Sequence, residues 1–318
     1  MATEEQLALT RALSGDGGLG VEESTLVSII GKWRKKPEEI SSFRKSFNRL
    51  FSINGHIEKC EDDHMQKLVI EFSRFHHITL LWAMHPHERD ARWAHQVTHK
   101  NHPASILIEI ACTRSAEELL GVRRAYQTLF HHSLEEDVAY QIKDSKSKLM
   151  VGLVSSYRYE GPKVDNDVAK SEAKALHNAI KTAGANKIIE HDEVVRILTT
   201  RSILHLKTIF KYYKELHGKY LEEDLSGDAL LLRTVLCIDS PASYFSQVID
   251  NAFKEGAKHA ETEGLSRVMV SRSDVDMEEI KEAYTKLYGA KLANIIAKKT
   301  HGCFRDSLLS LAGEAINA

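Results

Sequence analysis

A glycine-rich segment near the amino end has the composition of a cation-binding loop. Residues 16–23 read Asp-Gly-Gly-Leu-Gly-Val-Glu-Glu, with three glycines in four positions. Glycine adopts positive φ angles at no steric cost, so successive carbonyl oxygens can turn toward one point. Hard cations such as Ca²⁺ bind such oxygens together with carboxylates. The loop has little negative charge of its own, so a calcium site here needs a carboxylate from elsewhere. The alternative interpretation is a flexible turn, with Glu22 and Glu23 in the first turn of the next helix.

Seventeen histidines form a second group that could do chemistry. His95, His99 and His102 could share a helix face, but the chain has no His-Glu-x-x-His motif. A zinc site would need further ligands in a suitable frame, so we do not expect one. Because histidine gains its charge near pH 6, proton-dependent attraction to anionic lipid is a hypothesis that the composition leaves open.

The four cysteines are far apart and form no Cys-x-x-Cys motif: Cys60, Cys112, Cys237 and Cys303. Such spacing argues against a zinc knuckle. We expect Cys112 and Cys237, which lie in apolar helical runs, to be small buried hydrophobic residues. A redox-sensitive pair is the alternative.

The helices that must position these residues recur along the chain. An arginine, a tyrosine twelve residues later, a leucine three residues after that and a second leucine five residues further on occur three times: Arg114, Tyr126, Leu129 and Leu134; Arg201, Tyr213, Leu216 and Leu221; Arg272, Tyr284, Leu287 and Leu292. A less complete copy precedes them, in which Phe47 and Leu50 follow the helical run at residues 27–30. Recurrence at steps of roughly 70 to 90 residues indicates one helical unit used four times.

Composition agrees with a helical protein. Only five of 318 residues are proline, and apolar residues such as Ile280, Tyr284 and Leu287 follow a helical spacing. No useful stretch alternates with period two, so the predicted fold class is all-α. The net charge of −2 gives no general attraction to nucleic acid. Because no apolar run approaches the roughly 18 to 20 residues that span a membrane, and the first residues lack a signal region, we expect a soluble cytoplasmic protein.

The strongest linker signal is the segment 159–167, which contains Gly161-Pro162 and a run of polar residues. We expect repeat 1 at residues 1–85, repeat 2 at 86–157, a linker at 158–168, repeat 3 at 169–243 and repeat 4 at 244–318. The linker suggests two pairs of copies joined in the middle. All four should pack as one body, since each copy is too small to bury its helices alone.

The pattern resembles the annexin family, and the plant annexins most closely, over nearly the whole chain. Their repeat of about 70 residues carries G-x-G-T-D/E in its first loop, an arginine ending the second helix and an acidic residue in a later loop. Residues 113–115, 200–202 and 271–273 resemble the second-helix endings. The resemblance implies four annexin-type repeats of about five helices each, packed as a slightly curved disc.

The resemblance implies one calcium site, in the first copy. Its loop carbonyl ligands fall on Asp16, Gly18 and Gly20, and its bidentate acid falls on Glu71, in the segment Glu-Phe-Ser-Arg at 71–74. The spacing from Glu71 onward is like the family's.

The first copy also departs from the family. An insertion around 52–63 precedes Glu71 and makes three other residues rival acids: Glu61, Asp62 and Asp63. Val21 stands where the family has threonine, which removes a hydroxyl cap of about 1 kcal/mol. A weaker second site using Val21 and Glu23 is left open.

The other three copies lack a complete site. Copy two has no glycines in residues 98–103, and its later loop reads Lys-Asp-Ser-Lys at 143–146. Copy three keeps Asp224 but has no glycine pair in its first loop. Copy four has Lys299 where the family acid belongs, and a lysine there repels a divalent cation. We therefore expect weaker membrane binding than in a relative with two sites.

The resemblance implies calcium-dependent binding to anionic phospholipid, with Ca²⁺ as the only cofactor, bridging the first loop to lipid phosphates. We expect a peripheral protein that is cytoplasmic, reaches membranes when calcium rises, and has no enzymatic activity and no nucleic-acid partner. Trp33, Lys35 and Lys36 could add attraction to the lipid, or simply form a solvated face. Self-association is left open.

Three alternatives remain at this stage. One is a calcium-independent helical interaction scaffold, and another is an ion-conducting or stress-response annexin at a membrane. The third is an enzyme: residues 224–227 match a loose D-x-x-G pattern, but no phosphate-binding loop accompanies it. Actin binding is also uncertain, because Val195-Arg196-Ile197, which resembles an actin-binding tripeptide of the family, lies within a predicted core helix.

Overall fold

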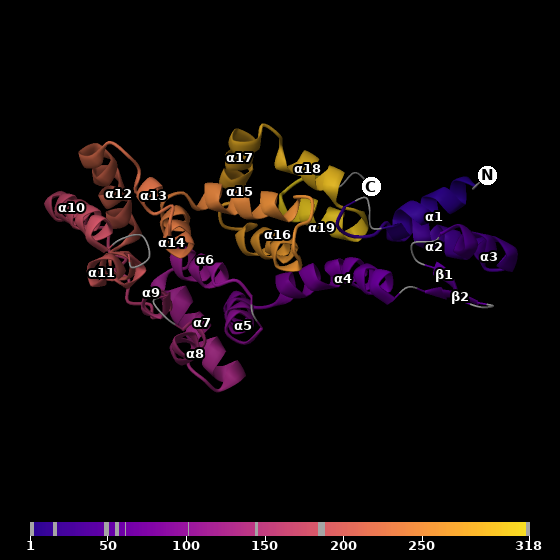
Figure 1. Cartoon of the computed structure of the whole chain (residues 1–318), viewed down its shortest axis with the longest axis horizontal. Helices are drawn as coiled ribbons and strands as arrows, with labels where there is room; N and C mark the ends of the chain where they lie inside the picture. Colours follow the sequence, from indigo (N-terminus) through magenta and orange to yellow (C-terminus); the bar gives the residue numbers. More distant parts are fainter. Residues whose placement is uncertain are drawn as a thin grey trace. The chain divides into compact units, whose positions relative to one another are not determined.

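A computed structural model describes residues 3–14, 18–47, 51–54, 57–60, 62–100, 102–143, 146–183 and 188–315. Helices make up most of it (Figure 1). The first quarter contains α1 (Glu4–Ser14), α2 (Glu23–Trp33), α3 (Pro37–Ser46), β1 (Phe51–Asn54), β2 (Ile57–Cys60) and α4 (Asp62–Ala83). The second contains α5 (Pro86–His99), α6 (Ser105–Thr113), α7 (Ala116–Phe130), α8 (Leu134–Gln141) and α9 (Lys146–Val154).

The second half repeats this order. Its first part contains α10 (Asn166–Ala183), the short 3₁₀ turn η1 (Ile188–Glu190), α11 (Asp192–Thr200), α12 (Ile203–His217), α13 (Leu221–Asp224) and α14 (Ala229–Asp239). Its last part contains α15 (Pro241–Ala252), α16 (His259–Arg272), α17 (Met277–Tyr288), α18 (Leu292–Lys299) and α19 (Gly302–Leu311). The all-α class and the repeat of about five helices are confirmed.

One element was not predicted. β1 and β2 form an antiparallel hairpin in which Phe51 lies opposite Cys60 and Asn54 opposite Ile57. The hairpin occupies the insertion that the sequence placed around 52–63. Of the rival acids, Glu61 lies outside the described residues.

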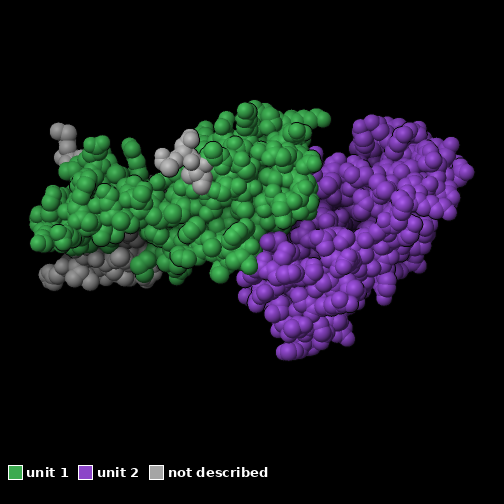
Figure 2. Space-filling view, turned by 180° about the vertical axis from the view of Figure 1, so that it is seen from behind, with its two compact units in different colours: residues 1–83, 246–318 green, residues 84–245 purple. Residues whose placement is uncertain are grey.

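The described chain divides into two compact units (Figure 2). Unit 1 contains residues 1–83 and 246–318, and unit 2 contains residues 84–245. The first quarter therefore groups with the last, and the two middle quarters group together. The sequence had suggested a different pairing, because a linker is visible in the chain but long-range contacts between its two ends are not.

The expected linker is held within unit 2. Arg158 donates hydrogen bonds to the carbonyl oxygens of Leu198 and Arg201, at the end of α11. The N–H of Ala116 donates to the Glu160 carboxylate. Helix ends leave carbonyl groups without partners, and a guanidinium satisfies two of them here. This segment is irregular in conformation but anchored at several points.

The recurring sequence pattern has direct structural causes. Ser115 and Ser202, each following a signature arginine, cap the next helix by accepting N–H groups of Glu118 and His205 at 3.2 Å. Gly218 is left-handed, with φ 72°, and ends α12. The three signature tyrosines and the second leucines of the pattern are buried: Tyr126, Tyr213, Tyr284, Leu134, Leu221 and Leu292.

The first leucine of the pattern behaves differently. Leu216 and Leu287 are 36% and 48% exposed.

Cys112 and Cys237 are buried, as expected, and Cys303 is exposed. No described helix is long and apolar enough to cross a bilayer.

Candidate cation site

The glycine loop is held against the last quarter of the chain within unit 1. The N–H of Leu19 donates to the Lys299 carbonyl at 2.8 Å, and the N–H of His301 donates to the Leu19 carbonyl at 2.9 Å. Gly18 and Gly20 have φ angles of 126° and 90°. A Cβ atom on Gly18 would lie 2.1 Å from the Lys299 carbonyl oxygen. The glycines are required both by the backbone conformation and by this close approach.

The loop lies beside the acid that the resemblance singled out. The N–H of Gly20 donates a hydrogen bond of 2.8 Å to Oε2 of Glu71, which α4 contributes. Gly18, Gly20 and Glu71 are thereby gathered in one region, whereas Asp16 lies outside the described residues. The contact between loop and acid in this structure is made by an N–H group. The carbonyl groups of the loop and the Glu71 carboxylate are nevertheless oxygen donors of the type that a hard cation takes, so the donor chemistry fits Ca²⁺.

A neighbouring arginine also binds the carboxylate of Glu71. Nε of Arg74 donates to Oε2 at 2.6 Å, and Nη2 donates to Oε1 at 2.7 Å. The side chains of Arg74 and Glu71 are 9% and 17% exposed. This contact of Arg74 was not predicted from the sequence. The spacing of three residues on a helix was the available signal, because side chains at i and i+3 are neighbours.

Glu22 and Glu23 point to the amino end of α19. Oε1 of Glu22 accepts the N–H of Gly302 at 3.1 Å, and Oε2 of Glu23 accepts the N–H of Cys303 at 3.1 Å. Arg305 also donates to Glu22 at 3.3 Å. Helix amino ends favour negative charge, so the first loop supplies the cap of a helix in the last quarter. The carboxylate of Glu23 is thus engaged, and the weaker second site remains only a prediction.

The candidate acids of the other copies differ in their surroundings. Asp224 accepts hydrogen bonds from the Tyr213 hydroxyl and the Lys219 ammonium. Lys299 has an exposed side chain, and its carbonyl binds the first loop. The copy-two residues 144–145 and the copy-three residues 184–187 lie outside the described part.

The signature arginines serve the packing of helices. Arg114 donates to both oxygens of Asp90, at 2.6 and 3.2 Å, and Arg272 binds Asp276 at 2.6 and 2.7 Å. In copy three the partner is Glu172, whose side chain is only 6% exposed.

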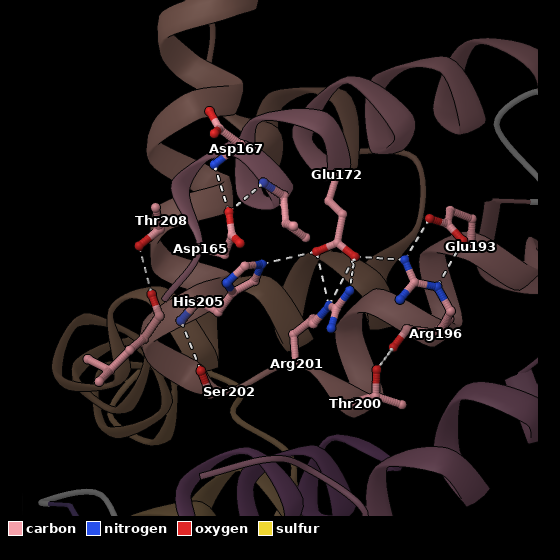
Figure 3. A network of polar contacts seen from close by, with 12 residues as sticks. Asp165, Asp167, Glu172, Glu193, Arg196, Thr200, Arg201, Ser202, His205 and Thr208 are labelled. Carbon is pink, nitrogen blue, oxygen red and sulfur yellow. Dashed lines mark hydrogen bonds and ion pairs between the residues drawn. The ribbon is translucent and has the colours of Figure 1, made fainter. Parts of the chain in front are cut away.

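Glu172 is the centre of a larger network (Figure 3). Arg201 donates to both of its oxygens, with a shortest contact of 2.6 Å, while Arg196 binds it at 2.7 Å and Nε2 of His205 lies 3.1 Å away. Burial alone would raise the pKa of this carboxyl, but hydrogen bonds from Arg201 and Arg196 outweigh burial and lower it. The network joins α10, α11 and α12.

Val195-Arg196-Ile197, the tripeptide that resembles an actin-binding sequence, lies in α11 beside this network. Val195 and Ile197 are 6% and 0% exposed, and Arg196 binds Glu172 and Glu193.

Paired histidine rings stack inside unit 2. His95 stacks on Phe130 with centroids 3.8 Å apart and on His99 at 4.1 Å. His177 stacks on His217 at 3.6 Å. Burial lowers the pKa of His95, His177 and His217. Within the part of the chain that the structure describes, no three His, Cys, Asp or Glu side chains are arranged to hold a metal ion.

The residues proposed to meet lipid beyond the second helix divide into two kinds. Trp33 is 3% exposed and donates its ring N–H to Glu5 at 2.7 Å, so it belongs to the core of the first quarter. Lys35 and Lys36 are exposed.

Comparison with known proteins adds independent findings. The family model "Annexin" matches residues 89–153, 171–229 and 244–311. Annexin D4 of Arabidopsis thaliana is 44% identical over 313 residues, which are 97% of both chains. Annexin Gh1 of Gossypium hirsutum is 36% identical and covers 99% of this chain and 96% of its own length.

Solved structures share the fold. Annexin III covers 98% of this chain and 94% of its own at 24% identity, with a TM-score of 0.69. Calcium-bound annexin (Sm)1 covers 98% and 90% at 19% identity, with a TM-score of 0.67.

Proposed function

Because the chain belongs to the annexin family, we propose that it binds anionic phospholipid surfaces in a calcium-dependent manner, through its first repeat. Annexins are generally calcium-dependent phospholipid-binding proteins. The supporting observation is the 2.8 Å hydrogen bond between the Gly20 N–H and Glu71, which brings loop and acid together. The protein would be cytoplasmic at rest and would bind membrane surfaces peripherally when calcium rises.

The proposed ligands are the carbonyl oxygens of Asp16, Gly18 and Gly20 and the carboxylate of Glu71. This donor set consists entirely of oxygen, as Ca²⁺ prefers. With one carboxylate, the site carries a single negative charge, and low ligand charge gives weak calcium binding. Lipid phosphate oxygens would complete the coordination, so affinity for calcium and for anionic lipid should rise together.

General electrostatic attraction would support the site. Lys35 and Lys36 are exposed and follow α2 in the same quarter of the chain. A lysine near an anionic surface contributes about 1 kcal/mol, and salt screens that contribution.

The test is sedimentation with vesicles of phosphatidylserine and phosphatidylcholine, with and without calcium. Wild type should pellet with calcium and stay in solution with chelator, and Glu71→Gln should stay in solution in both. Asp63→Asn is the matched control, because Asp63 is an exposed rival acid on the same helix. Loss of binding in Asp63→Asn together with full binding in Glu71→Gln would identify Asp63, and not Glu71, as the carboxylate that binds calcium.

A calcium-independent interaction scaffold is the second candidate. Two observations favour it: Arg74 already neutralises Glu71, and α4 exposes Val69 and Trp82, at 62% and 64%. The same sedimentation separates the two functions. Equal pellets in calcium and in chelator, unchanged by Glu71→Gln, would favour the scaffold.

A further inference from the structure

We propose that Arg74 is a built-in competitor of calcium, whose guanidinium holds the Glu71 carboxylate until the ion displaces it. This inference rests on the proposed function and deepens it, because it states how the same site is regulated. It assigns to Arg74 the control of calcium affinity in the first repeat.

The contact geometry carries the proposal. Nε and Nη2 of Arg74 meet the two oxygens of Glu71 at 2.6 and 2.7 Å, so the guanidinium binds them in a two-pronged arrangement. Such bidentate pairs are the stronger kind of charge-assisted hydrogen bond. Both side chains are largely removed from water, at 9% and 17% exposure, so salt screens the pair less than it would a surface pair.

A bidentate calcium ion needs the same two oxygens. The ion and the guanidinium are both cationic, and at contact distance they repel each other. Oε2 of Glu71 also accepts the N–H of Gly20, so three donors already use this carboxylate. Calcium binding and the Arg74 contact therefore exclude one another, and the ion must release the arginine first.

Release of the arginine is a local change. Arg74 lies three residues after Glu71 on α4, so its departure needs only side-chain rotation and leaves the helix intact. The apparent dissociation constant equals the intrinsic constant divided by the fraction of molecules with a free carboxylate. If the pair is formed in about nine of ten molecules, removal of the arginine tightens calcium binding about tenfold.

The experiment is calorimetric titration of the full chain with Ca²⁺ alone, in wild type, Arg74→Gln and Arg74→Lys. Arg74→Gln removes the charge, shortens the side chain and keeps a similar helix propensity, and this variant should bind calcium about tenfold more tightly than wild type. The calcium affinity of Arg74→Lys should lie between those of wild type and Arg74→Gln, because lysine is a point charge without the planar fork of arginine.

Lys299→Gln is the matched charge control. Its side chain is exposed and its carbonyl accepts the N–H of Leu19, whereas the Glu71 carboxylate is bound by Gly20 and Arg74. A gain in Lys299→Gln as large as that in Arg74→Gln would mean a general charge effect and would overturn the inference.

The remaining outcomes separate the two proposals. Equal affinities in wild type and Arg74→Gln, both abolished by Glu71→Gln, would overturn the competitor and leave the proposed function intact. Absence of binding heat in every variant would overturn both.

A second readout does not depend on a stable Arg74→Gln protein. The Nε–Hε resonance of Arg74 in the wild type, assigned by its loss in Arg74→Lys, should shift on calcium saturation. An unchanged resonance in protein that has bound calcium would contradict the release of the arginine.

Discussion

The hydroxyl of Tyr213 donates a hydrogen bond to the carboxylate of Asp224, and the ammonium of Lys219 binds the other oxygen of that carboxylate. Tyr126 binds Asp137 in copy two in the same way, at 2.6 Å. Burial, aided by the hydrogen bond to the carboxylate, raises the pKa of each tyrosine. The acid that copy three retained therefore satisfies a buried tyrosine and stabilises the fold.

This role predicts that Asp224→Asn will destabilise the protein without changing its calcium stoichiometry. Two charge-assisted hydrogen bonds are weakened, and bonds of this kind contribute about 1.5–3 kcal/mol each. We expect the free energy of unfolding to fall by about 2 kcal/mol in urea titration. Glu215→Gln is the control, since Glu215 is half exposed and 3.9 Å from Lys211. A lower calcium stoichiometry in Asp224→Asn would instead identify Asp224 as a ligand.

Glu172→Gln should lower the free energy of unfolding more than Asp224→Asn does, because Glu172 is buried among two arginines and a histidine. Arg196 and Arg201 are 42% and 37% exposed, so removing the charge of Glu172 should cost about 3 kcal/mol, the lower end of the range for buried ion pairs. Glu190→Gln, an exposed change in the same copy, should cost under about 0.5 kcal/mol. Urea unfolding at pH 7 measures both, and equal midpoints for the two variants would contradict the structural role.

The sign of the pH dependence follows from the lowered pKa of Glu172. The unfolded carboxyl, with its ordinary pKa of 4.5, binds a proton before the folded one does. The contribution is therefore complete above pH 4.5 and is lost as the pH falls toward the folded pKa. The stability difference between wild type and Glu172→Gln should shrink below pH 4.5, and a difference that grows there would contradict this assignment.

Much of the fold followed from the repeated pattern. The recurrence of Arg201, Tyr213 and Leu221 in the other copies indicated helices, because buried positions on a helix impose their spacing on the sequence. The glycine loop and Glu71 could be placed together only through a family resemblance, since 51 residues separate Gly20 from Glu71 and no local pattern joins them.

Other features depend on contacts that the linear sequence does not express. The i,i+3 spacing of Glu71 and Arg74 permits their contact, but whether it forms depends on the rotamers of both side chains. The burial of Trp33 depends on packing against Phe43 and on a hydrogen bond to Glu5. The hairpin at 51–60 has strands of four residues each, which are too short for a period-two signal.

The stacked rings of His177 and His217 predict a loss of stability in mild acid. Burial is the largest cause that lowers the pKa of both. The charge of His217 lowers the pKa of His177 further, and Lys181 and Lys219 lower the pKa of both rings, whereas Asp224 opposes them. As the pH falls below 6.5, these histidines bind protons in the unfolded chain before they do so in the folded protein. The free energy of unfolding therefore decreases as the pH falls. The loss cannot exceed about 1.4 kcal/mol per histidine per pH unit.

His217→Phe should reduce this pH dependence. Phe130 stacks on His95 in copy two, so a phenyl ring is compatible with this kind of site. Between pH 7.5 and 5.5 the free energy of unfolding should fall less in His217→Phe than in wild type. His132→Gln, which changes an exposed histidine, should fall as the wild type does. An identical slope in wild type and His217→Phe would exclude this ring pair as the source.

Gly18→Ala should damage both the fold of unit 1 and the calcium site. At Gly18, with φ 126°, a side chain strains the backbone by about 1–3 kcal/mol, and the new Cβ would lie 2.1 Å from the Lys299 carbonyl oxygen. We expect the thermal midpoint to fall and calcium affinity to drop, because the loop must leave residues 299–301. Gly31→Ala is the matched control: Gly31 lies in α2 with open space around it, so alanine there should stabilise the helix by up to about 1 kcal/mol. A thermal midpoint of Gly18→Ala at or above that of Gly31→Ala, together with normal calcium binding, would contradict the close contact between the first loop and Lys299.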